Sequence, residues 1–549
     1  GCAHNSSGTY DDTATGALPR TRAPRPTTAA ITAGDLMTRV YIFADDSMEG
    51  RRSGSPGSAR ANAYSVRELE RLGLQPAGEN GSFYQDVPLV TRGYDATAAL
   101  TVDGGAALKY GSDFLPAIGR GTPRVLDAAE VVYGGTFPDD TTLTPEQMRG
   151  KLVLFSPSPR MQGFQPFPRL AGTRWAEAAG VALVSLERAS EQAQRGLRTP
   201  SLAVNSGASR PNTPVTLYVS RTAAEAMLGR PLEGAAVGTT GRTVRGRVAL
   251  VETPVPARNV IAVIPGSDPA LRGQYVAVGA HNDHIGVAPR AVDHDSLRAW
   301  NRQAWVLRGM VAGAPPLTAA HRASITVNMD SLRRLRPTRR DSVNNGADDD
   351  ASGSMALLEI AEQMMATGAK PRRSIVFVWH TGEELGLLGA QWFTDHPTVP
   401  RDSIVAQVNI DMIGRGTAND TRGGGPNYVG LVGARRLSTQ LGDLVETVNR
   451  ERRTPLVLDY SLDANGHPEN IYCRSDHYMY ARYGIPIVFF FTGLHEDYHQ
   501  VTDEPQYLDY PHYASITQYL SDLTVRIANL DQRPVVDQPR PDPTAACRQ

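Results

Sequence analysis

The chain is short of cysteine and has no long uninterrupted apolar run. Its 549 residues include three cysteines, Cys2, Cys473 and Cys547. Three cysteines cannot form the multiple-disulfide framework of a small secreted scaffold, and the sequence leaves open whether Cys473 and Cys547 are bridged. No stretch reaches the ~18 apolar residues that a membrane-spanning helix needs. The sequence therefore predicts no transmembrane segment.

The chain also lacks an excess of charge of either sign. Lys and Arg number 56 and Asp and Glu number 57, which gives a formal net charge of -1 at pH 7. No overall basic field exists to attract nucleic acid or an anionic membrane, so neither is an expected partner. With 41% hydrophobic and 21% charged residues, the composition is typical of a folded globular protein and excludes disorder along the whole chain.

The first 30 residues have the composition of a linker. The sequence opens with Gly1-Cys2 and continues rich in Ala, Ser, Thr, Gly and Pro. This pattern resembles a bacterial lipoprotein after removal of its signal peptide. It predicts an exported protein in which Cys2 carries a lipid anchor and residues 1–30 form a flexible tether. The alternative is an ordinary disordered tail.

Periodicity changes twice along the chain. Helices are predicted at 33–43 and 58–73, and residues 125–255 contain short β-like runs broken by Gly and Pro, which indicates a β-rich insert domain. From residue 256 onward, strand-length apolar runs alternate with helical patterns. Because these runs are apolar on both faces, they predict an α/β fold with a mixed, mostly parallel sheet between helices. The predicted strands are 260–264, 275–280, 375–379, 404–410 and 485–491, and the predicted helices are 354–365, 385–396, 435–450 and 513–530.

Two further segments interrupt or follow this order. Residues 288–342 are rich in Arg and contain Trp, and a connection of that length is usually a functional lid or a disordered loop. Residues 531–549 are rich in Pro and Asp, which predicts a loose C-terminal tail.

Acids and histidines gather where the predicted strands end. Ligand sites of α/β sheets lie at the carboxyl ends of the strands, so one convergent metal site explains these residues together. Imidazole and carboxylate ligands suit zinc, and a catalytic zinc keeps a position for water. The five segments are His281-Asn282-Asp283-His284, Asp348-Asp349-Asp350, Glu383-Glu384, Asp411, and His495 to His499.

Spacing suggests separate roles within two of these segments. His281 and Asp283 lie two residues apart, on the same side of an extended chain, so Asp283 can hydrogen-bond the ring nitrogen of His281 that faces away from the metal. The adjacent Glu383 and Glu384 point in different directions. They divide naturally into one metal ligand and one general base beside the attacking water.

In order and type, the five segments resemble the co-catalytic two-zinc exopeptidases, the family of aminopeptidases and glutamate carboxypeptidases. Ser47-Met48-Glu49-Gly50-Arg51 and Gly54-Ser55-Pro56-Gly57 also look like the lead-in of this family. The resemblance implies that 31–124 is the N-terminal part of the peptidase domain and that 256–530 is its catalytic domain. The insert at 125–255 is similar in position to a protease-associated domain. The insertion at 288–342 departs from the family pattern.

The resemblance implies two zinc ions per chain and a role for each motif residue. His281 and Asp411 would hold one zinc, Glu384 and His499 the other. Asp349 would bridge both, and its bond to Asp350 would be the cis bond of the family. Glu383 would be the general base, Asp283 would orient His281, and Tyr498 would polarise the substrate carbonyl. The implied reaction is the release of N-terminal residues from peptides.

Four alternatives remain open. A carboxypeptidase or dipeptidase would use the same site and an Arg that binds the substrate carboxylate. A glutaminyl cyclase would use a single zinc, and a non-catalytic binding module would have lost ligands. Residues 495–499 also read H-E-x-x-H, the one-zinc protease motif, but the predicted loop context lacks the helix which that motif requires. The remaining histidines are predicted to be structural or surface residues: His284, His294, His321, His380 and His467.

Overall fold

The computed structural model describes residues 18–105, 107–117, 122–139, 142–160, 163–164, 175–205, 207, 212–368 and 371–549. The chain forms two compact units, Gly1–Val87 with Pro256–Gln549, and Pro88–Val255. We call them the larger unit and the insert. The chain leaves the larger unit within β2 (Tyr84–Tyr94) and re-enters it within β14 (Leu250–Ile264). All five segments of the predicted site belong to the larger unit.

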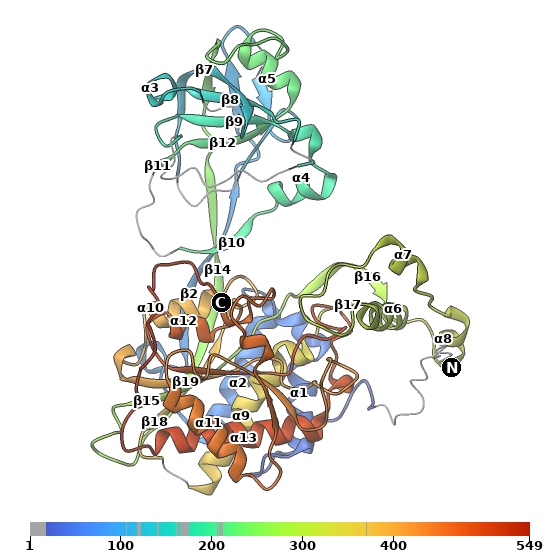
Figure 1. Cartoon of the computed structure of the whole chain (residues 1–549), viewed down its shortest axis with the longest axis vertical. Helices are drawn as coiled ribbons and strands as arrows, with labels where there is room; N and C mark the ends of the chain where they lie inside the picture. Colours follow the sequence, from blue (N-terminus) through green and yellow to red (C-terminus); the bar gives the residue numbers. More distant parts are fainter. Residues whose placement is uncertain are drawn as a thin grey trace. The chain divides into compact units, whose positions relative to one another are not determined.

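A mixed sheet forms the centre of the larger unit (Figure 1). Its middle strands run in the order β18, β15, β19, β22 and are parallel to one another, whereas β14 and β20 flank them in antiparallel orientation. This arrangement confirms the predicted mixed α/β sheet, in which the middle strands are parallel and the outer ones largely antiparallel. The strands are β15 (Tyr275–His281), β18 (Ser374–His380), β19 (Ile404–Ile410), β20 (Tyr428–Val432), β21 (Val457–Asp459) and β22 (Ile487–Phe491).

Helices cover both faces of this sheet because its strands are apolar on both sides. Phe377 and Trp379 of β18 pack in one core with α1, α2, α9 and α13, whereas Val376 and Val378 face the other core with α10 and α12. Both cores are fully buried along the middle strands. The helices are α1 (Ala33–Phe43), α2 (Pro56–Leu72), α9 (Gly353–Thr367), α10 (Leu388–Asp395), α11 (Thr439–Glu451), α12 (His477–Ala481) and α13 (Tyr510–Ala528).

The lead-in to the fold is more ordered than a tether. Residues 1–17, including Cys2, lie outside the described residues, but Thr27 donates a 2.7 Å hydrogen bond to Glu362 of α9. Thr28 donates a 2.7 Å hydrogen bond to Asp35 of α1. The predicted flexibility is therefore wrong for residues 18–30, because this segment lies against α1 and α9 and its hydroxyls are paired there.

The insert is β-rich, as predicted, but begins earlier than residue 125. Its eight-stranded sheet has the order β4-β3-β13-β7-β8-β9-β12-β5, so strands that precede residue 125 belong to it. The predicted boundary is wrong because the short strands before it carry too weak a pattern. The elements are β3 (Ala99–Val102), β4 (Ala107–Lys109), β5 (Phe114–Pro116), β7 (Leu126–Phe137), α3 (Pro145–Met148), β8 (Leu152–Pro157), β9 (Gly180–Val184), α4 (Glu191–Arg198), β12 (Val215–Val219), α5 (Arg221–Leu228) and β13 (Thr240–Gly246), and β10 (Ser201–Val204) pairs with β2.

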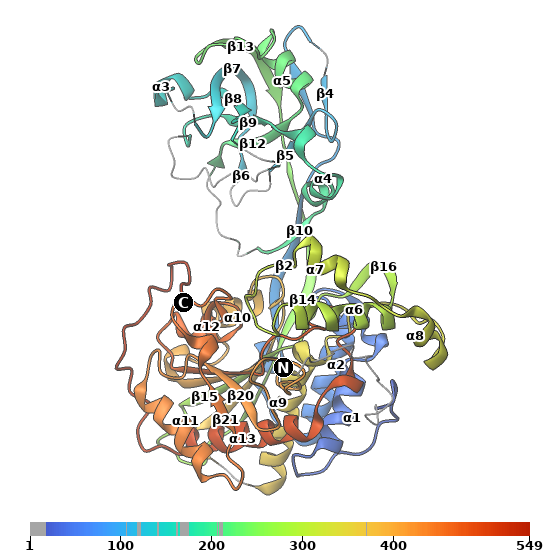
Figure 2. The ribbon, with the colours of Figure 1, turned by 45° about the vertical axis from the view of Figure 1, so that its right-hand side comes forward.

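Residues 288–342 fold into helices closed by a two-stranded ribbon. β16 (Val287–Asp293) pairs antiparallel with β17 (Arg340–Val343), and α6 (His294–Leu307), α7 (Ala319–Ser324) and α8 (Met329–Leu335) lie between them in the chain. Figures 1 and 2 show the three helices gathered beside β16. The segment is therefore folded, which excludes the disordered loop among the two predicted alternatives.

The C-terminal tail is held against the larger unit. Cys547 forms a disulfide with Cys473, which answers the question that the sequence left open. Asp537 accepts a 3.0 Å hydrogen bond from the backbone of Thr439, and the side chain of Gln549 accepts one of 2.9 Å from the backbone of Tyr472. The predicted loose tail is therefore wrong, because a covalent bond and polar contacts hold it. Among the described helices, none is both long and apolar enough to cross a lipid bilayer.

Candidate metal centre and active site

The carboxyl ends of the parallel strands bring the predicted site residues together. β15 ends at His281, β19 is followed directly by Asp411, and the loops after β18 and β22 carry the glutamates and His499. Asp349 lies in the turn before α9. All eight predicted residues fall within this one region: His281, Asp283, Asp349, Glu383, Glu384, Asp411, Tyr498 and His499.

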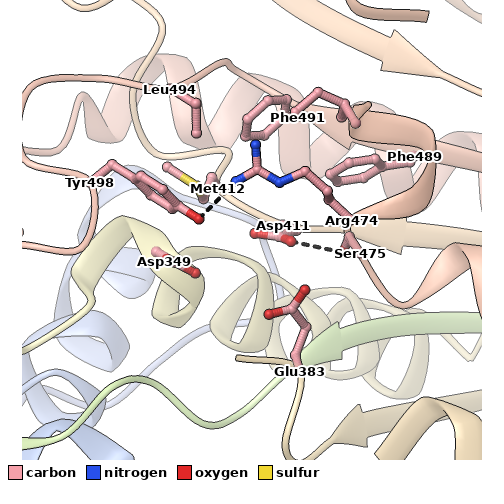
Figure 3. Close-up of a pocket in the computed structure, with 11 residues that line it drawn as sticks. Asp349, Glu383, Asp411, Met412, Arg474, Ser475, Phe489, Phe491, Leu494 and Tyr498 are labelled. Atoms are coloured by element: carbon pink, nitrogen blue, oxygen red, sulfur yellow. Dashed lines mark hydrogen bonds between the residues drawn. The ribbon is translucent and has the colours of Figure 1, made fainter. Parts of the chain in front are cut away.

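A first group of ligand-type atoms surrounds His281. Its Nε2 atom lies 3.1 Å from Oδ1 of Asp349 and 3.6 Å from Oδ1 of Asp411. The other oxygen of Asp411 accepts a 2.7 Å hydrogen bond from Ser475 (Figure 3), which orients the carboxylate. Asp350 is also close, but its oxygens accept backbone N–H bonds from Gly353 at 2.7 Å and from His281 at 3.1 Å, so they are already occupied.

A second group surrounds Glu384. Nε2 of His499 lies 2.9 Å from Oε2 of Glu384 and 3.1 Å from Oδ2 of Asp349. Asp349 therefore points one carboxylate oxygen at each group. A carboxylate in that position can bridge two cations, which is the arrangement that co-catalytic metal sites use.

His284 is a member of the second group that the sequence reasoning missed. It is 1% exposed, and its Nδ1 atom lies 2.7 Å from Oε1 of Glu384. Gly346 makes room for the ring, because a Cβ atom there would lie 2.6 Å from the imidazole of His284. Of the predicted alternatives, a surface residue is excluded by this burial, and the ring lies in the group of ligand-type side chains. Its signal was present, since His284 follows Asp283 at the same strand end as His281.

The chemistry of the cluster fits a bound cation. His284 and His499 approach carboxylate oxygens closely, yet among the residues that the structure describes neither Nε2 of His499 nor Nδ1 of His284 has a hydrogen-bond partner. Side chains that converge on a common point rather than on one another behave as metal ligands do. Buried carboxylates without a counter-ion are costly, and a dication among imidazoles and carboxylates removes that cost.

The pKa values of Glu383 and of the bridging residue Asp349 are shifted in opposite directions. Burial, with the nearby Glu384 and Asp411 carboxylates, raises the pKa of Glu383 well above its usual range, although His281 opposes the shift. Burial also disfavours the charged form of Asp349, but the adjacent imidazoles of His281 and His499 hold its pKa well below the usual range. A raised pKa in a buried carboxyl group is suited to accepting and passing on a proton.

Asp283 supports the site differently from the predicted way. Nδ1 of His281 lies 3.1 Å from the backbone carbonyl oxygen of Asp283 and 3.8 Å from its carboxylate. The carboxylate instead accepts hydrogen bonds from Ser53 at 3.0 Å and from the backbone N–H of Glu383 at 3.1 Å. Asp283 thus connects the lead-in, His281 and Glu383. Burial raises its pKa to about 7.

Buried polar contacts hold the acidic turn. Asp503 accepts backbone N–H bonds from Asp348 at 3.0 Å and from Asp349 at 3.1 Å. Arg51 is fully buried and donates to the backbone carbonyl oxygens of Asn345 and Gly346 at 2.5 and 2.8 Å. The peptide bond between Asp349 and Asp350 is cis, as the resemblance implied. The lead-in therefore serves to position the bridging carboxylate.

Residues 495–499 do not form the H-E-x-x-H site. The segment is a turn rather than a helix, so its two histidines do not share a helix face. His495 is buried and its Nε2 atom lies 3.2 Å from Asp348, outside the two ligand groups. Glu496 lies 3.5 Å from Arg302 and 3.6 Å from Arg415. These partners leave only His499 of this segment in the candidate metal centre.

A small pocket of about 40 Å³ opens beside the first group (Figure 3). Glu383, Asp349 and Asp411 line it on one side. Arg474 reaches across the pocket, and its guanidinium donates a 3.2 Å hydrogen bond to the Tyr498 hydroxyl. The remaining walls are mostly apolar: Met412, Ile471, Phe489, Phe491 and Leu494, with Ser475. The pocket can accept one apolar side chain next to the acids.

The fold is an α/β sheet that carries clustered imidazole and carboxylate groups at its strand ends, and part of the chain matches a known peptidase family. Residues 317–524 match the sequence model of Peptidase family M28, and this match confirms the resemblance drawn from the motifs. The match covers the acidic turn, the two glutamates, Asp411 and His499.

Individual relatives match over shorter parts. The chain is 31% identical over 199 residues to leucine aminopeptidase 1 of Coccidioides posadasii, which is 34% of this chain and 47% of that protein. It is 39% identical over 77 residues to leupeptin-inactivating enzyme 1 of Streptomyces exfoliatus, 14% of this chain and 18% of that one. The chain thus spans less than half the length of these relatives. A solved aminopeptidase from Aneurinibacillus sp. strain AM-1 aligns with 16% identity and a TM-score of 0.46, covering 92% of this chain and 97% of that one.

Proposed function

We propose that the protein is a zinc-dependent exopeptidase that removes the N-terminal residue of a peptide. One observation carries the proposal: Asp349 presents one oxygen to each of two imidazole–carboxylate groups, and Glu383 and the small pocket lie beside them. Three carboxylates at the pocket attract a free α-amino group, and its apolar walls accept the first side chain. Hydrolysis then releases that residue.

The proposed centre holds two zinc ions. His281 and Asp411 would bind one, Glu384 and His499 the other, and Asp349 both. Bound zinc supplies Lewis-acid polarisation of the scissile carbonyl and lowers the pKa of the attacking water. His284 lies against Glu384 and would fix the orientation of that ligand.

Three residues of the chain would carry out the proton transfer and positioning. Glu383 accepts the proton of the attacking water and passes it to the leaving amine. Asp283 holds the backbone of Glu383 in place through its 3.1 Å hydrogen bond. Burial keeps the pKa of Tyr498 above its usual value, so its hydroxyl stays protonated and can donate to the carbonyl oxygen of the substrate.

A carboxypeptidase or dipeptidase is the second candidate, and Arg474 favours it. This guanidinium lines the pocket and could bind a substrate carboxylate. It already pairs with Glu469 and Tyr498, however, so a substrate would have to compete for it. For this reason the N-terminal reaction is the first proposal. A glutaminyl cyclase needs only one zinc, and a non-catalytic module would not retain Glu383 together with every predicted ligand.

The remaining proposals concern the parts around the catalytic domain. We assign the insert to a protease-associated domain because of its position in the chain and its β-rich sheet. Export of the protein, with a lipid anchor at Cys2, rests on the composition of the first 30 residues alone.

A panel of peptides tests the proposed function. Leucyl peptides with a free N-terminus, the same peptides N-acetylated, and peptides ending in Glu would be incubated with and without a chelator. We expect chelator-sensitive release of leucine from the free peptides only. Release of C-terminal Glu from the acetylated peptides would instead establish the carboxypeptidase, and hydrolysis that a chelator leaves untouched would refute a metal-dependent reaction.

A further inference from the structure

A second cavity of about 220 Å³ adjoins the pocket at the metal centre. It lies between α6 of the 288–342 insertion and the loop after β22. Leu494 and Tyr498 line both the pocket and the cavity, so the two spaces are separated only by these shared side chains. On α6, Asn301 and Trp305 share one face because they lie four positions apart, and Trp300 lines the same cavity.

Ion pairs fix α6 against this loop. Arg298 of α6 lies 2.6 Å from the fully buried carboxylate of Asp497, which also contacts Arg415 at 3.2 Å. One turn further along α6, Arg302 lies 3.5 Å from Glu496. Burial makes such pairs sensitive to the loss of either partner. These ion pairs therefore hold the cavity wall formed by α6 against the loop that carries His499.

Two donors that line the cavity lack a partner. Asn301 is only 8% exposed, yet within the described part of the chain its Nδ2 atom has no hydrogen-bond partner, and the same is true of Nε of Arg308. A buried donor without a partner costs free energy unless a ligand or water satisfies it. Trp300 is 38% exposed at the rim and Trp305 is 5% exposed within. The cavity thus offers hydrogen-bond donors for a carbonyl oxygen and aromatic surface for an apolar side chain.

We propose that this cavity is a second substrate subsite, which binds the peptide residue that follows the scissile bond. The inference rests on the proposed function. When the N-terminal residue of a peptide occupies the first pocket, every further residue lies beyond the scissile bond. The cavity adjoins that pocket next to Tyr498, so it can receive the first of these residues. Asn301 donates to a main-chain carbonyl oxygen of the substrate. The two tryptophans favour a large apolar side chain at that position.

Three amides test the subsite. Leucinamide has no second residue, whereas Leu-Gly-amide and Leu-Phe-amide differ only in the side chain that the cavity would receive. We expect kcat/KM for Leu-Phe-amide to exceed that for Leu-Gly-amide by about tenfold or more, since a well-placed apolar group gives that much discrimination. Trp300→Ala should bring this ratio close to 1. Asn301→Ala should lower kcat/KM for both dipeptide amides about fivefold relative to leucinamide, as expected for one lost hydrogen bond.

Leu335→Ala on α8 is the control, because this side chain is 48% exposed in the same insertion and does not line the cavity. Thermal unfolding of each variant would show that it is folded, and the exposure of Trp300 makes its substitution tolerable. A wild-type ratio near 1, or equal losses on all three amides in both variants, would overturn the subsite while leaving the proposed function in place. Failure of the wild type to hydrolyse any of them would instead remove the proposed function itself.

Discussion

Replacement of Glu383 by Gln would separate catalysis from metal binding. Glu383 lines the pocket beside Asp349 and Asp411, and its side chain is 11% exposed. Its Oε2 atom is 4.0 Å from Nε2 of His281. The amide of Gln has nearly the same shape but cannot accept a proton from water. The backbone N–H bond to Asp283 does not involve the side chain, so the loop should keep its conformation.

The expected loss is large because general-base catalysis contributes about 10²- to 10⁴-fold. A loss of about 10²-fold corresponds to about 2.7 kcal/mol of lost transition-state stabilisation, since each ~1.36 kcal/mol is tenfold in rate. We expect kcat to fall by at least that factor while KM changes little. Removing one buried negative charge also relieves repulsion with Glu384, so the free energy of unfolding should not decrease.

The assay is steady-state hydrolysis of leucinamide, with bound zinc measured on the same samples. Glu451→Gln is the matched control, because it makes the same chemical change on an exposed carboxylate that pairs with Arg526. This control should keep wild-type turnover. If Glu383→Gln retained more than about a tenth of wild-type kcat with its zinc in place, Glu383 would not be the base.

Three further outcomes are expected. Dialysis against a chelator should abolish turnover and release two zinc ions per chain, and zinc should restore it; a single tightly bound ion in fully active protein would contradict the two-metal centre. Glu496→Gln should cost at most a few-fold in turnover, whereas His281→Ala should abolish it, since Glu496 lies among arginines rather than at the ligand groups; the reverse pattern would restore the one-zinc interpretation. His284→Gln should weaken zinc binding about 10- to 100-fold, the usual effect of losing a residue that orients a metal ligand, and competition with a zinc-binding dye would measure it; an unchanged affinity would assign His284 to packing alone.

Much of the site could be predicted from local features of the sequence. Runs such as 275–280 and 404–410 are largely apolar, which indicates strands buried on both faces. Residues that directly follow such parallel strands must meet at one edge of the sheet. His281 and Asp411 could therefore be placed together, although 130 positions separate them in the chain.

Three features depend on contacts between distant segments and could be known only from the tertiary structure. The strand end placed His284 near the site, but its contact with Glu384 at 2.7 Å joins two distant segments and could be seen only in the tertiary structure. Pairing of short strands set the start of the insert near residue 88, because such strands are defined by their partners. The 288–342 insertion lacks a long periodic run, and its placement depends on buried ion pairs such as Arg298 with Asp497. Periodicity reports which face of a segment is buried, but only packing determines which residues of other segments lie against that face.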